Sequence, residues 1–262
     1  MKKINDYAEL NRLVMSRFGR DFATNYFISR EIAENEINSG KMYFHEFGNS
    51  LFIFRDKGDH FSLYYCMKIG DELELPAFPN VTVAETAFRE RDEKLKKADE
   101  SLVSAGFRRE FYRNRMKRLP QELKERSDDL PSENVRTANS RDFDLTHELL
   151  FSCFSPLTGC LPDENELRIA LNEGRILLHR RGGLLHYEET KAGCELRHLC
   201  VSEKARGCGT GGEMVRAYNF LLDKNGKKSV VWVREGYAPA EKIYEKNGYK
   251  IDGTRSSVLI FR

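Results

Sequence analysis

A glycine-rich turn between a predicted strand and a predicted helix contains the residues best suited to bind an anion. It reads Arg206-Gly-Cys-Gly-Thr-Gly-Gly212 and follows an apolar stretch that ends at Val201. Glycine lacks the Cβ that would keep a phosphate away from the main chain, and it allows positive φ angles that turn neighbouring N–H groups toward one point. A helix predicted at residues 213–222 adds its unpaired first N–H groups and its positive dipole end. The sequence therefore predicts a pyrophosphate site at residues 206–212.

The spacing of this loop excludes two other kinds of phosphate loop. The loop of nucleoside triphosphatases requires Lys and then Ser or Thr after its last glycine, whereas Glu213 follows Gly212. The dinucleotide fingerprint requires Gly-x-Gly-x-x-Gly and an acidic residue at the end of the next strand, but the next predicted strand ends at Arg234. The pattern that remains is Arg206-x-x-Gly209-x-Gly211.

This pattern, five residues after Val201, resembles the acetyl-coenzyme A pyrophosphate loop of the GCN5-related N-acetyltransferase (GNAT) superfamily. Further along the chain, the run Ala240-x-x-x-Tyr244-x-x-x-Gly248-Tyr249 resembles the second signature of that superfamily. The two motifs occur in the order and at the separation typical of its members. One residue departs from the pattern: Tyr237 stands where many members carry Asn, which contacts the pantetheine arm.

The resemblance implies acetyl-CoA as the co-substrate, and we expect no metal ion. It implies that a main-chain N–H near Leu199 or Cys200 binds the thioester carbonyl oxygen, and that the separated end of the same strand holds the pantetheine arm. The predicted cofactor-binding residues are Leu199, Cys200, Val201, Arg206, Gly207, Cys208, Gly209, Thr210, Gly211 and Gly212.

Amine acetylation requires a base, because a free alkyl amine has a pKa near ~10.4 and is mostly protonated at neutral pH. Glu195 lies six residues before Val201, at the offset of the catalytic glutamate in histone-type members of the superfamily. Strand alternation predicts that Glu195 shares a face with Arg197, Leu199 and Val201. The alternative is an ordinary solvated carboxylate that pairs with Arg197.

Three other residues are further candidates for the base: His198, His186 and Glu188. His198 is predicted on the opposite strand face, with Leu196 and Cys200. A single histidine in a strand is more often a half-buried, hydrogen-bonded residue than a catalyst, so Glu195 is preferred.

Tyr244 corresponds by motif to the residue that protonates the coenzyme A thiolate in many members. Its phenol, with a pKa near ~10, is suited to that task. The alternative is that its ring packs in the core beside Ile243. A covalent route through the thiol of Cys200 or Cys208 lacks an assigned base, so we expect direct transfer in a ternary complex.

The predicted fold class is α/β (α+β), a mixed sheet with helices on both faces. Strands are predicted at residues 135–138, 175–180, 183–188, 194–201, 227–233 and 256–261, and helices at 142–154 and 163–173, which is the element order of the acetyltransferase fold. We expect an acetyl-CoA-binding domain at residues 131–262, a polar linker at 119–134 and a separate domain at 1–120.

The first half of the chain repeats part of this order. Helices are predicted at 4–18 and 22–38, followed by strands, a helix and a long strand at 107–119, but residues 69–79 lack a phosphate loop. This indicates a tandem, degenerate GNAT-like copy without a cofactor site; an unrelated α/β domain is the alternative. Arg109, Arg113, Arg115 and Lys117 fall on one face of the long strand, which predicts either an acidic ligand or a charged, solvated edge strand.

The composition of the 262 residues, with 32% charged and 40% hydrophobic residues and a net charge of +2, is typical of a globular protein and gives no indication of nucleic-acid or membrane binding. Without a span or a secretion signal, we expect a cytoplasmic protein. The six cysteines show no metal-ligand spacing, so we expect reduced, mostly buried thiols and no disulfide.

Three functions compete at this point. The first is an acetyl-CoA-dependent N-acetyltransferase that acts on a primary amine of a small molecule or peptide. The second keeps the acyl-CoA site without catalysis, as a sensor or scaffold. The third is aminoacyl transfer from charged tRNA to cell-wall peptides by tandem acetyltransferase-like proteins, which lack a well-formed coenzyme loop. The acceptor, the acyl chain length and the oligomeric state are left open.

Overall fold

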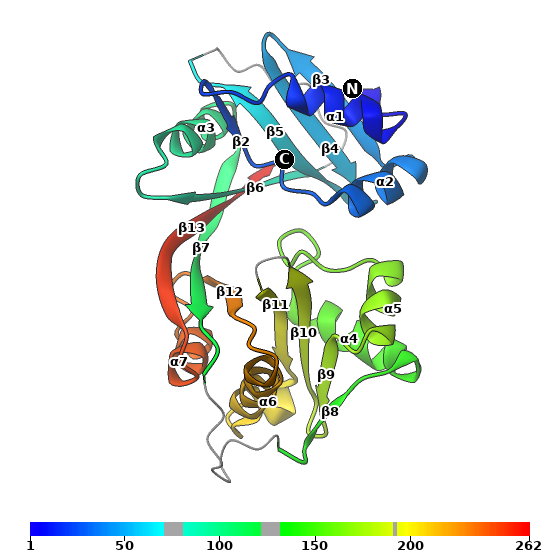
Figure 1. Ribbon diagram of the computed structural model, residues 1–262, viewed down its shortest axis with the longest axis vertical. Coiled ribbons are helices and arrows are strands. Elements are labelled where there is room, and N and C mark those ends of the chain that lie inside the picture. The colour runs from blue at the N-terminus through cyan, green and yellow to red at the C-terminus, as the bar shows by residue number, and fades with distance from the viewer. Residues whose placement is uncertain (71–80, 122–131, 191–192) are drawn as a thin grey trace. The chain divides into compact units, whose positions relative to one another are not determined.

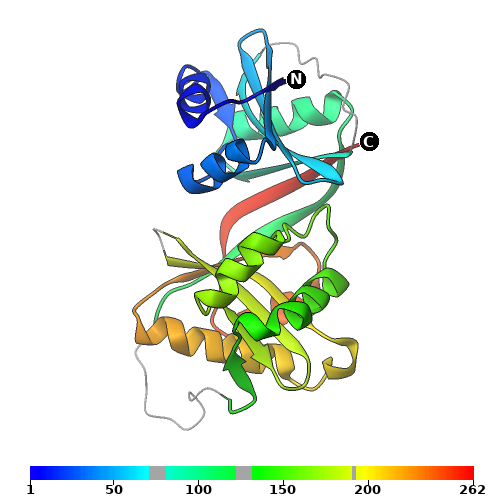
Figure 2. The same ribbon diagram turned by 90° about the vertical axis from the view of Figure 1, so that its right-hand side faces the viewer.

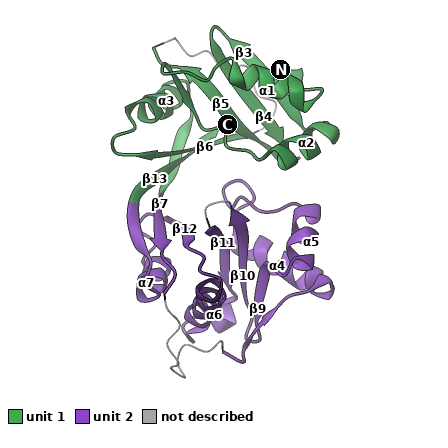
Figure 3. Ribbon diagram, viewed as in Figure 1, with its two compact units in different colours: residues 1–113, 253–262 green, residues 114–252 purple. Residues whose placement is uncertain are grey.

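The computed structural model describes residues 1–70, 81–121, 132–190 and 193–262, which form two compact units (Figures 1 and 3). The first unit comprises Met1–Arg113 and Gly253–Arg262, and the second comprises Asn114–Asp252. This division differs from the expected domains at 1–120 and 131–262, because the last residues of the chain pair with a strand of the first unit. Residues 122–131 of the predicted linker lie outside the described residues.

The second unit contains a five-stranded mixed sheet with the order β8-β9-β10-β11-β12, which the end of β7 (Arg108–Arg118) joins beside β12. All pairs from β8 to β11 are antiparallel, and β11 and β12 are parallel. Its elements are β8 (Val135–Thr137), α4 (Phe143–Cys153), α5 (Glu164–Asn172), β9 (Ile176–His179), β10 (Gly183–Thr190), β11 (Gly193–Val201), α6 (Thr210–Lys224), β12 (Ser229–Arg234) and α7 (Ala238–Lys246).

Helices cover both faces of this sheet (Figures 1 and 2). On one face, α6 packs in a core cluster that includes Leu185, Leu196, Met214, Val215, Tyr218 and Val231. On the other face, α4 and α5 pack in a cluster that includes Leu150, Leu167, Leu171, Leu178, Leu184 and Cys200. The predicted mixed α/β fold is confirmed.

Local sequence explains two of these elements. Helix α5 begins with a capping box, in which Asp163 and Glu166 each accept a hydrogen bond from the main-chain N–H of the other, at 2.9 Å. Gly183 allows β10 to pass close to α6, since a Cβ at this position would lie 2.7 Å from Sδ of Met214 and 2.9 Å from Cγ2 of Thr210.

In the first unit the strands follow the order β1-β3-β4-β5-β6-β13. Helices α1 and α2 pack on one face and α3 on the other. Its elements are β1 (Lys2–Lys3), α1 (Tyr7–Met15), β2 (Phe22–Thr24), α2 (Arg30–Asn38), β3 (Met42–Phe47), β4 (Ser50–Asp56), β5 (His60–Lys68), β6 (Val81–Arg89), α3 (Glu93–Ser104) and the parts of β7 and β13 (Lys250–Phe261) that belong to it.

The prediction of a helix at residues 22–38 is wrong for the first part of this range. Residues Phe22–Thr24 form β2 and pair with β5, opposite Lys68, Met67 and Cys66. Helix α2 begins only after Ser29, whose hydroxyl accepts a hydrogen bond from the N–H of Ile32 at 3.3 Å. A serine N-cap at this position sets the helix start, and strand pairing determines what precedes it.

The two units share one order of elements. Three antiparallel strands, a fourth strand parallel to the third, a helix and a last strand occur as β3 to β7 and again as β9 to β13. In the second unit α6 connects the parallel pair, whereas most of the corresponding connection in the first unit, residues 71–80, lies outside the described residues. The duplication and the missing loop of the first copy therefore stay predictions.

Four of the five arginines of β7 are ion-paired and no more than 29% exposed, and β7 is an interior strand of the sheet, not an edge. Each pairs with an acidic residue of its own unit: Arg109 with Asp99, Arg113 with Glu85, Arg115 with Asp252 and Arg118 with Asp223. The expected charged edge strand is therefore wrong, because the charges meet partners that only the tertiary structure brings close.

The Arg118–Asp223 pair gives a stability prediction. Its two parallel contacts measure 2.7 and 2.6 Å, and the side chains are only 5% and 9% exposed. Removal of one partner leaves a buried charge, so Arg118→Met should lower the free energy of unfolding by about 3 kcal/mol in urea denaturation. Arg108→Met, which breaks the exposed pair with Glu110, is the control and should cost less than about 1 kcal/mol. Equal losses in the two variants would contradict this account.

Candidate active site

The glycine loop precedes a helix that starts three residues earlier than expected. Helix α6 begins at Thr210, so Gly211 and Gly212 lie in its first turn. Only Gly207 and Gly209 have positive φ angles, of 77° and 81°. The predicted left-handed glycines are therefore the first two of the four, and they turn the chain from β11 into the helix.

The main chain of this loop is available to a ligand. Among the described residues, the N–H groups of residues 207–212 make no hydrogen bond to another main-chain carbonyl. The positions that a Cβ would take at Gly207 and Gly209 have no atom within 4 Å, whereas a Cβ at Gly211 would lie 3.1 Å from Cδ1 of Ile243 in α7. One side of the loop thus packs on the protein and the other side presents unused donors. This arrangement fits the diphosphate of a coenzyme.

Two arginines lie at the loop. Arg206 is exposed, and its Nε donates to the carbonyl of Val201 at 3.2 Å. Arg181, from the turn between β9 and β10, donates from Nη1 to the carbonyl of Cys208 at 3.3 Å. Sequence reasoning missed Arg181, because only the tertiary structure brings this turn to the loop.

A hydrogen-bonded carboxylate holds the start of α6. Glu213 Oε2 accepts from Ser132 at 2.8 Å and from Asn134 at 2.9 Å, and it lies 3.2 Å from Nε2 of His179 on β9. His179 Nδ1 accepts from the N–H of Arg181 at 3.1 Å, so Nε2 carries the proton and donates it to Glu213. These contacts lower the pKa of Glu213 to about 2, with the hydrogen bonds from Asn134 and Ser132 as the largest causes.

The parallel strands β11 and β12 separate at the middle of β11. They pair only at residues 194–196 of β11, which continues to Val201 while paired with β10 on its other side. From Arg197 onward, one edge of β11 has no strand pairing with β12. The sequence predicted such a separated strand end for the pantetheine arm, and this edge has the required extended main chain.

A β-bulge lies at the point of separation. In the register with β10, His186 pairs with His198 and Tyr187 pairs with Leu196, so Arg197 is one extra residue in β11. The bulge changes the alternation: Leu196 and Leu199 both contact the α6 side, although they are three residues apart. Glu195 therefore shares a face with His198 and Cys200, and its predicted face with Leu199 and Val201 is wrong.

Leu199 and Val201 lie against the glycine loop instead. Their Cδ2 and Cγ2 atoms are 3.8 and 3.7 Å from the position of a Cβ at Gly211. Thr210 is 1% exposed and packs beside them in the first turn of α6. The structure thus brings together the residues predicted for the cofactor, except that the side chain of Cys200 points to the opposite face.

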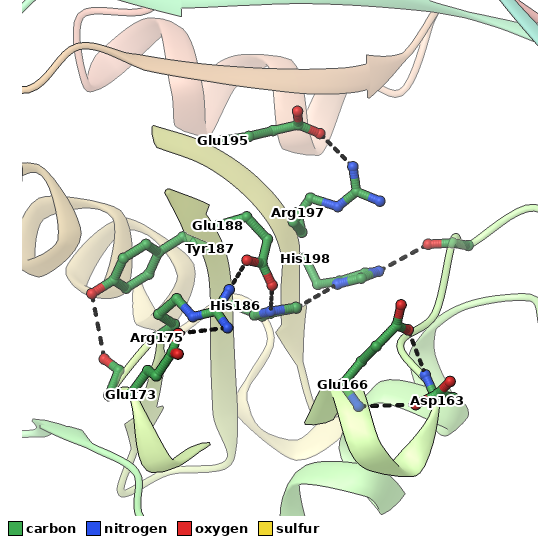
Figure 4. Close-up of polar contacts among 12 residues, drawn as sticks. Asp163, Glu166, Glu173, Arg175, His186, Tyr187, Glu188, Glu195, Arg197 and His198 are labelled. Atoms are coloured by element: carbon green, nitrogen blue, oxygen red, sulfur yellow. Dashed lines mark hydrogen bonds and ion pairs between the residues drawn. The ribbon is translucent and has the colours of Figure 1, made fainter. Parts of the chain in front are cut away.

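Glu195 and Glu188 lie directly opposite each other on β11 and β10. Glu195 accepts a hydrogen bond from Nη1 of Arg197 at 2.7 Å, and Glu188 forms an ion pair with Arg175 (Figure 4). Their side chains are 21% and 34% exposed. The pairing of Glu195 with Arg197 is the alternative raised from the sequence. The sheet therefore presents two carboxylates, each beside an arginine, near the place where β11 and β12 separate.

A line of hydrogen-bonded side chains begins at Glu188 and enters the protein (Figure 4). Glu188 Oε1 lies 2.9 Å from Nε2 of His186, and His186 Nδ1 lies 3.2 Å from Nδ1 of His198. His198 Nε2 lies 2.8 Å from the carbonyl oxygen of Gly159, in the connection between α4 and α5. Burial lowers the pKa of His186 well below its ordinary value, and His198, Arg197 and Arg175 add to this effect.

Tyr244 lies in the core of the second unit, 4% exposed, with its ring centroid 5.5 Å from that of Tyr249. Burial raises the pKa of Tyr244, and the neighbouring Tyr249 contributes. The phenol is therefore held protonated, as a proton donor must be. Its role toward a thiolate stays a prediction, beside the core packing that the structure shows.

One disulfide corrects the expectation of free thiols. Cys153, at the end of α4, is bonded to Cys200 on β11, with Cα atoms 6.1 Å apart. The bond forms on the face that the bulge assigns to Cys200, and the separation of 47 residues gives no signal for it in the sequence. Cys66 and Cys194 are buried thiols, while Cys160 and Cys208 are exposed.

The described residues contain no group of three or more His, Cys, Asp or Glu side chains that could hold a metal ion. No helix in the described part of the chain is long and apolar enough to cross a membrane.

Comparison with known structures identifies the fold as that of GCN5-related N-acetyltransferases. An acetyltransferase of this family from Colwellia psychrerythraea matches with a TM-score of 0.58 at 11% identity, over 100% of this chain and 99% of the other. A GCN5-related N-acetyltransferase from Sphaerobacter thermophilus matches with a TM-score of 0.56 at 13% identity, over 93% and 96%. The GCN5-related glucosamine N-acetyltransferase region of a fungal multi-domain β-N-acetylglucosaminidase matches with a TM-score of 0.57 at 14% identity, over 80% and 31%.

Residues 177–258 match the model of the FR47-like protein family. This range contains the glycine loop, the bulged strand and the Ala240–Tyr249 run. The resemblance to the GNAT superfamily inferred from these motifs is thereby confirmed. No curated protein matches the sequence significantly.

The contacts of Glu213 predict a pH dependence of stability. Because folding lowers the pKa of Glu213 from 4.5 to about 2, its contribution is complete above pH 4.5 and is lost as the pH falls toward 2. Glu213→Gln should cost about 1–3 kcal/mol of unfolding free energy at pH 7 in urea denaturation, and the difference from wild type should shrink at pH 3.

Glu203→Gln is the matched control. Glu203 precedes the same loop, but its side chain is 89% exposed, so this variant should match the wild type at both pH values. A constant difference between Glu213→Gln and wild type from pH 7 to pH 3 would show that the ionised carboxylate is not the cause.

Proposed function

We propose that this protein transfers an acetyl group from acetyl-CoA to a primary amine of a small molecule or peptide. The fold supports acyltransferase activity in general. The observation that supports an acyl-CoA donor in this chain is the set of unused N–H groups at residues 207–212, at the end of a strand whose other edge is open.

The residues of the chain fit the coenzyme in three places. The loop and the first turn of α6 would bind the diphosphate, with Arg206 and Arg181 as nearby cations. The open edge of β11, from Arg197 to Val201, offers main-chain groups to the pantetheine arm and to the thioester carbonyl. Bound acetyl-CoA supplies an activated acyl group.

An amine acceptor suits the charges beside this edge. Glu195 and Glu188 present two carboxylates on the same sheet face, and a protonated amine is attracted to both. Transfer forms a C–N bond, breaks the C–S bond, removes a proton from the nitrogen and returns one to sulfur. Tyr244 is proposed as the donor to sulfur. We assign Glu195, which accepts a hydrogen bond from Arg197 beside the open edge of β11, to binding the amine.

The first test concerns the coenzyme. Gly209→Val should weaken acetyl-CoA binding at least tenfold in calorimetry, because a β-branched side chain is strained at a φ of 81° and projects where the loop is open. Gly226→Val is the control, since Gly226 also has a positive φ, of 61°, and open space around it, but lies beyond the end of α6. Unchanged affinity in Gly209→Val, or an equal loss in the control, contradicts the assignment.

The second test concerns catalysis. Wild-type protein mixed with acetyl-CoA and a panel of amines, including amino sugars and peptides, should release free thiol. Glu195→Gln should raise the KM for the amine about tenfold, because a contact between charged groups worth ~1.5 kcal/mol is lost, with acetyl-CoA affinity unchanged. Coenzyme binding without turnover of any amine would favour the sensor or scaffold function, for which the exposed Tyr237 in place of Asn is the supporting observation.

A further inference from the structure

The hydrogen bonds that run from Glu188 through His186 and His198 to the carbonyl of Gly159 restrict where the protons of these groups can lie. A carbonyl oxygen only accepts, so Nε2 of His198 carries a proton. If both imidazoles are neutral, Nδ1 of His198 has a lone pair and must accept from Nδ1 of His186. Nε2 of His186 then also has a lone pair, which faces the carboxylate of Glu188 at 2.9 Å.

Three contacts are all satisfied only with three protons, while two neutral imidazoles carry two, so the form with neutral imidazoles and an ionised Glu188 can accept one more proton. The third proton can reside on Glu188, on His186 or, after a shift along the line, on His198, and each placement satisfies every contact. We call Glu188, His186 and His198 the His–Glu cluster. Its titration belongs to the three groups together rather than to one residue.

The surroundings disfavour the third proton on His186, because burial lowers the pKa of this imidazole well below its ordinary value. His186 is 3% and His198 2% exposed, and Arg175 and Arg197 are the nearby cations. Glu195 faces the cluster from β11, whereas Asp163, the N-cap of α5, and Glu166, in its first turn, are engaged in the capping box. Two residues of the connection between α4 and α5 contact His198. The carbonyl of Gly159 accepts its hydrogen bond, and the ring centroid of Phe154 lies 4.9 Å from that of His198.

We propose that the His–Glu cluster is the base of the reaction: Glu188, 34% exposed, accepts the proton that leaves the amine, and His186 and His198 share it. This inference rests on the proposed function. When the amine nitrogen bonds to the acyl carbon, its proton passes to Glu188, directly or through water, while the C–S bond breaks and the thiolate takes a proton from Tyr244. The cluster then returns its extra proton to solvent. Glu188 touches the amine, and the two histidines act through it as positioning residues.

Histidine NMR tests the cluster without any substrate. Long-range ¹H–¹⁵N spectra should show the ring nitrogens of His186 and His198 titrating together in one step, because one proton is shared. Glu188→Gln should abolish this step, since the amide donates a permanent hydrogen to Nε2 of His186 and keeps the line of contacts intact. Independent titration of the two rings, or a step that survives in Glu188→Gln, overturns the proposal.

Kinetics provide the second measurement. Glu188→Gln should lower kcat by about 100-fold and remove the acidic limb of the pH–rate profile, with the KM for acetyl-CoA unchanged. His186→Gln should also remove that limb, because an amide cannot pass a proton on. The control is Glu189→Gln on the same strand, an exposed carboxylate paired with Nζ of Lys227 at 2.7 Å, which should keep the wild-type profile.

The two proposals fail in different ways. Absence of turnover in the wild type contradicts the proposed function, and the NMR titration still decides whether the cluster shares a proton. Turnover with an unchanged pH profile in both Glu188→Gln and His186→Gln contradicts the cluster as the base and leaves acyl transfer in place.

Discussion

The extra residue at Arg197 is the constraint on which the candidate site depends. A strand normally sends alternate side chains to opposite faces, and one inserted residue reverses the assignment for everything beyond it. In β11 this reversal directs Leu199 toward α6 and leaves Glu195, His198 and Cys200 on the face covered by α4 and α5. The same insertion lies where β11 leaves β12, so one irregularity both opens the main chain and gathers the polar side chains.

The charges on this face are balanced before any ligand arrives. Glu195 and Glu188 each have an arginine beside them, whereas the imidazoles of His186 and His198 are buried. The proposed cationic acceptor would therefore compete with Arg197 and Arg175 for the carboxylates rather than meet unpaired charge. Because these ion pairs are partly exposed, their exchange for an ammonium group costs little, whereas the hydrogen bonds around His186 and His198 are shielded from water and persist.

Local rules made the glycine loop and the order of elements predictable from the sequence. Gly207 and Gly209 mark a turn whose backbone few other residues adopt, and the apolar strands around it set the sheet. The bulge was harder, although its trace is visible: apolar residues at 194 and 196 are followed by Leu199 and Val201, a shift of one position. The Cys153–Cys200 bond and the contact of Arg181 with the loop depend on tertiary packing, for which sequence spacing has no signal.

The last strand has a consequence for the order in which the chain can fold. Residues 254–261 of β13 pair with β6, yet they are synthesised after the whole of the second unit. Until they arrive, β6 exposes a row of unpaired amides and carbonyls along an apolar strand, an edge of the kind that promotes pairing with other chains. A nascent chain of this protein must therefore keep its first unit from aggregating until residues 254–261 have been synthesised.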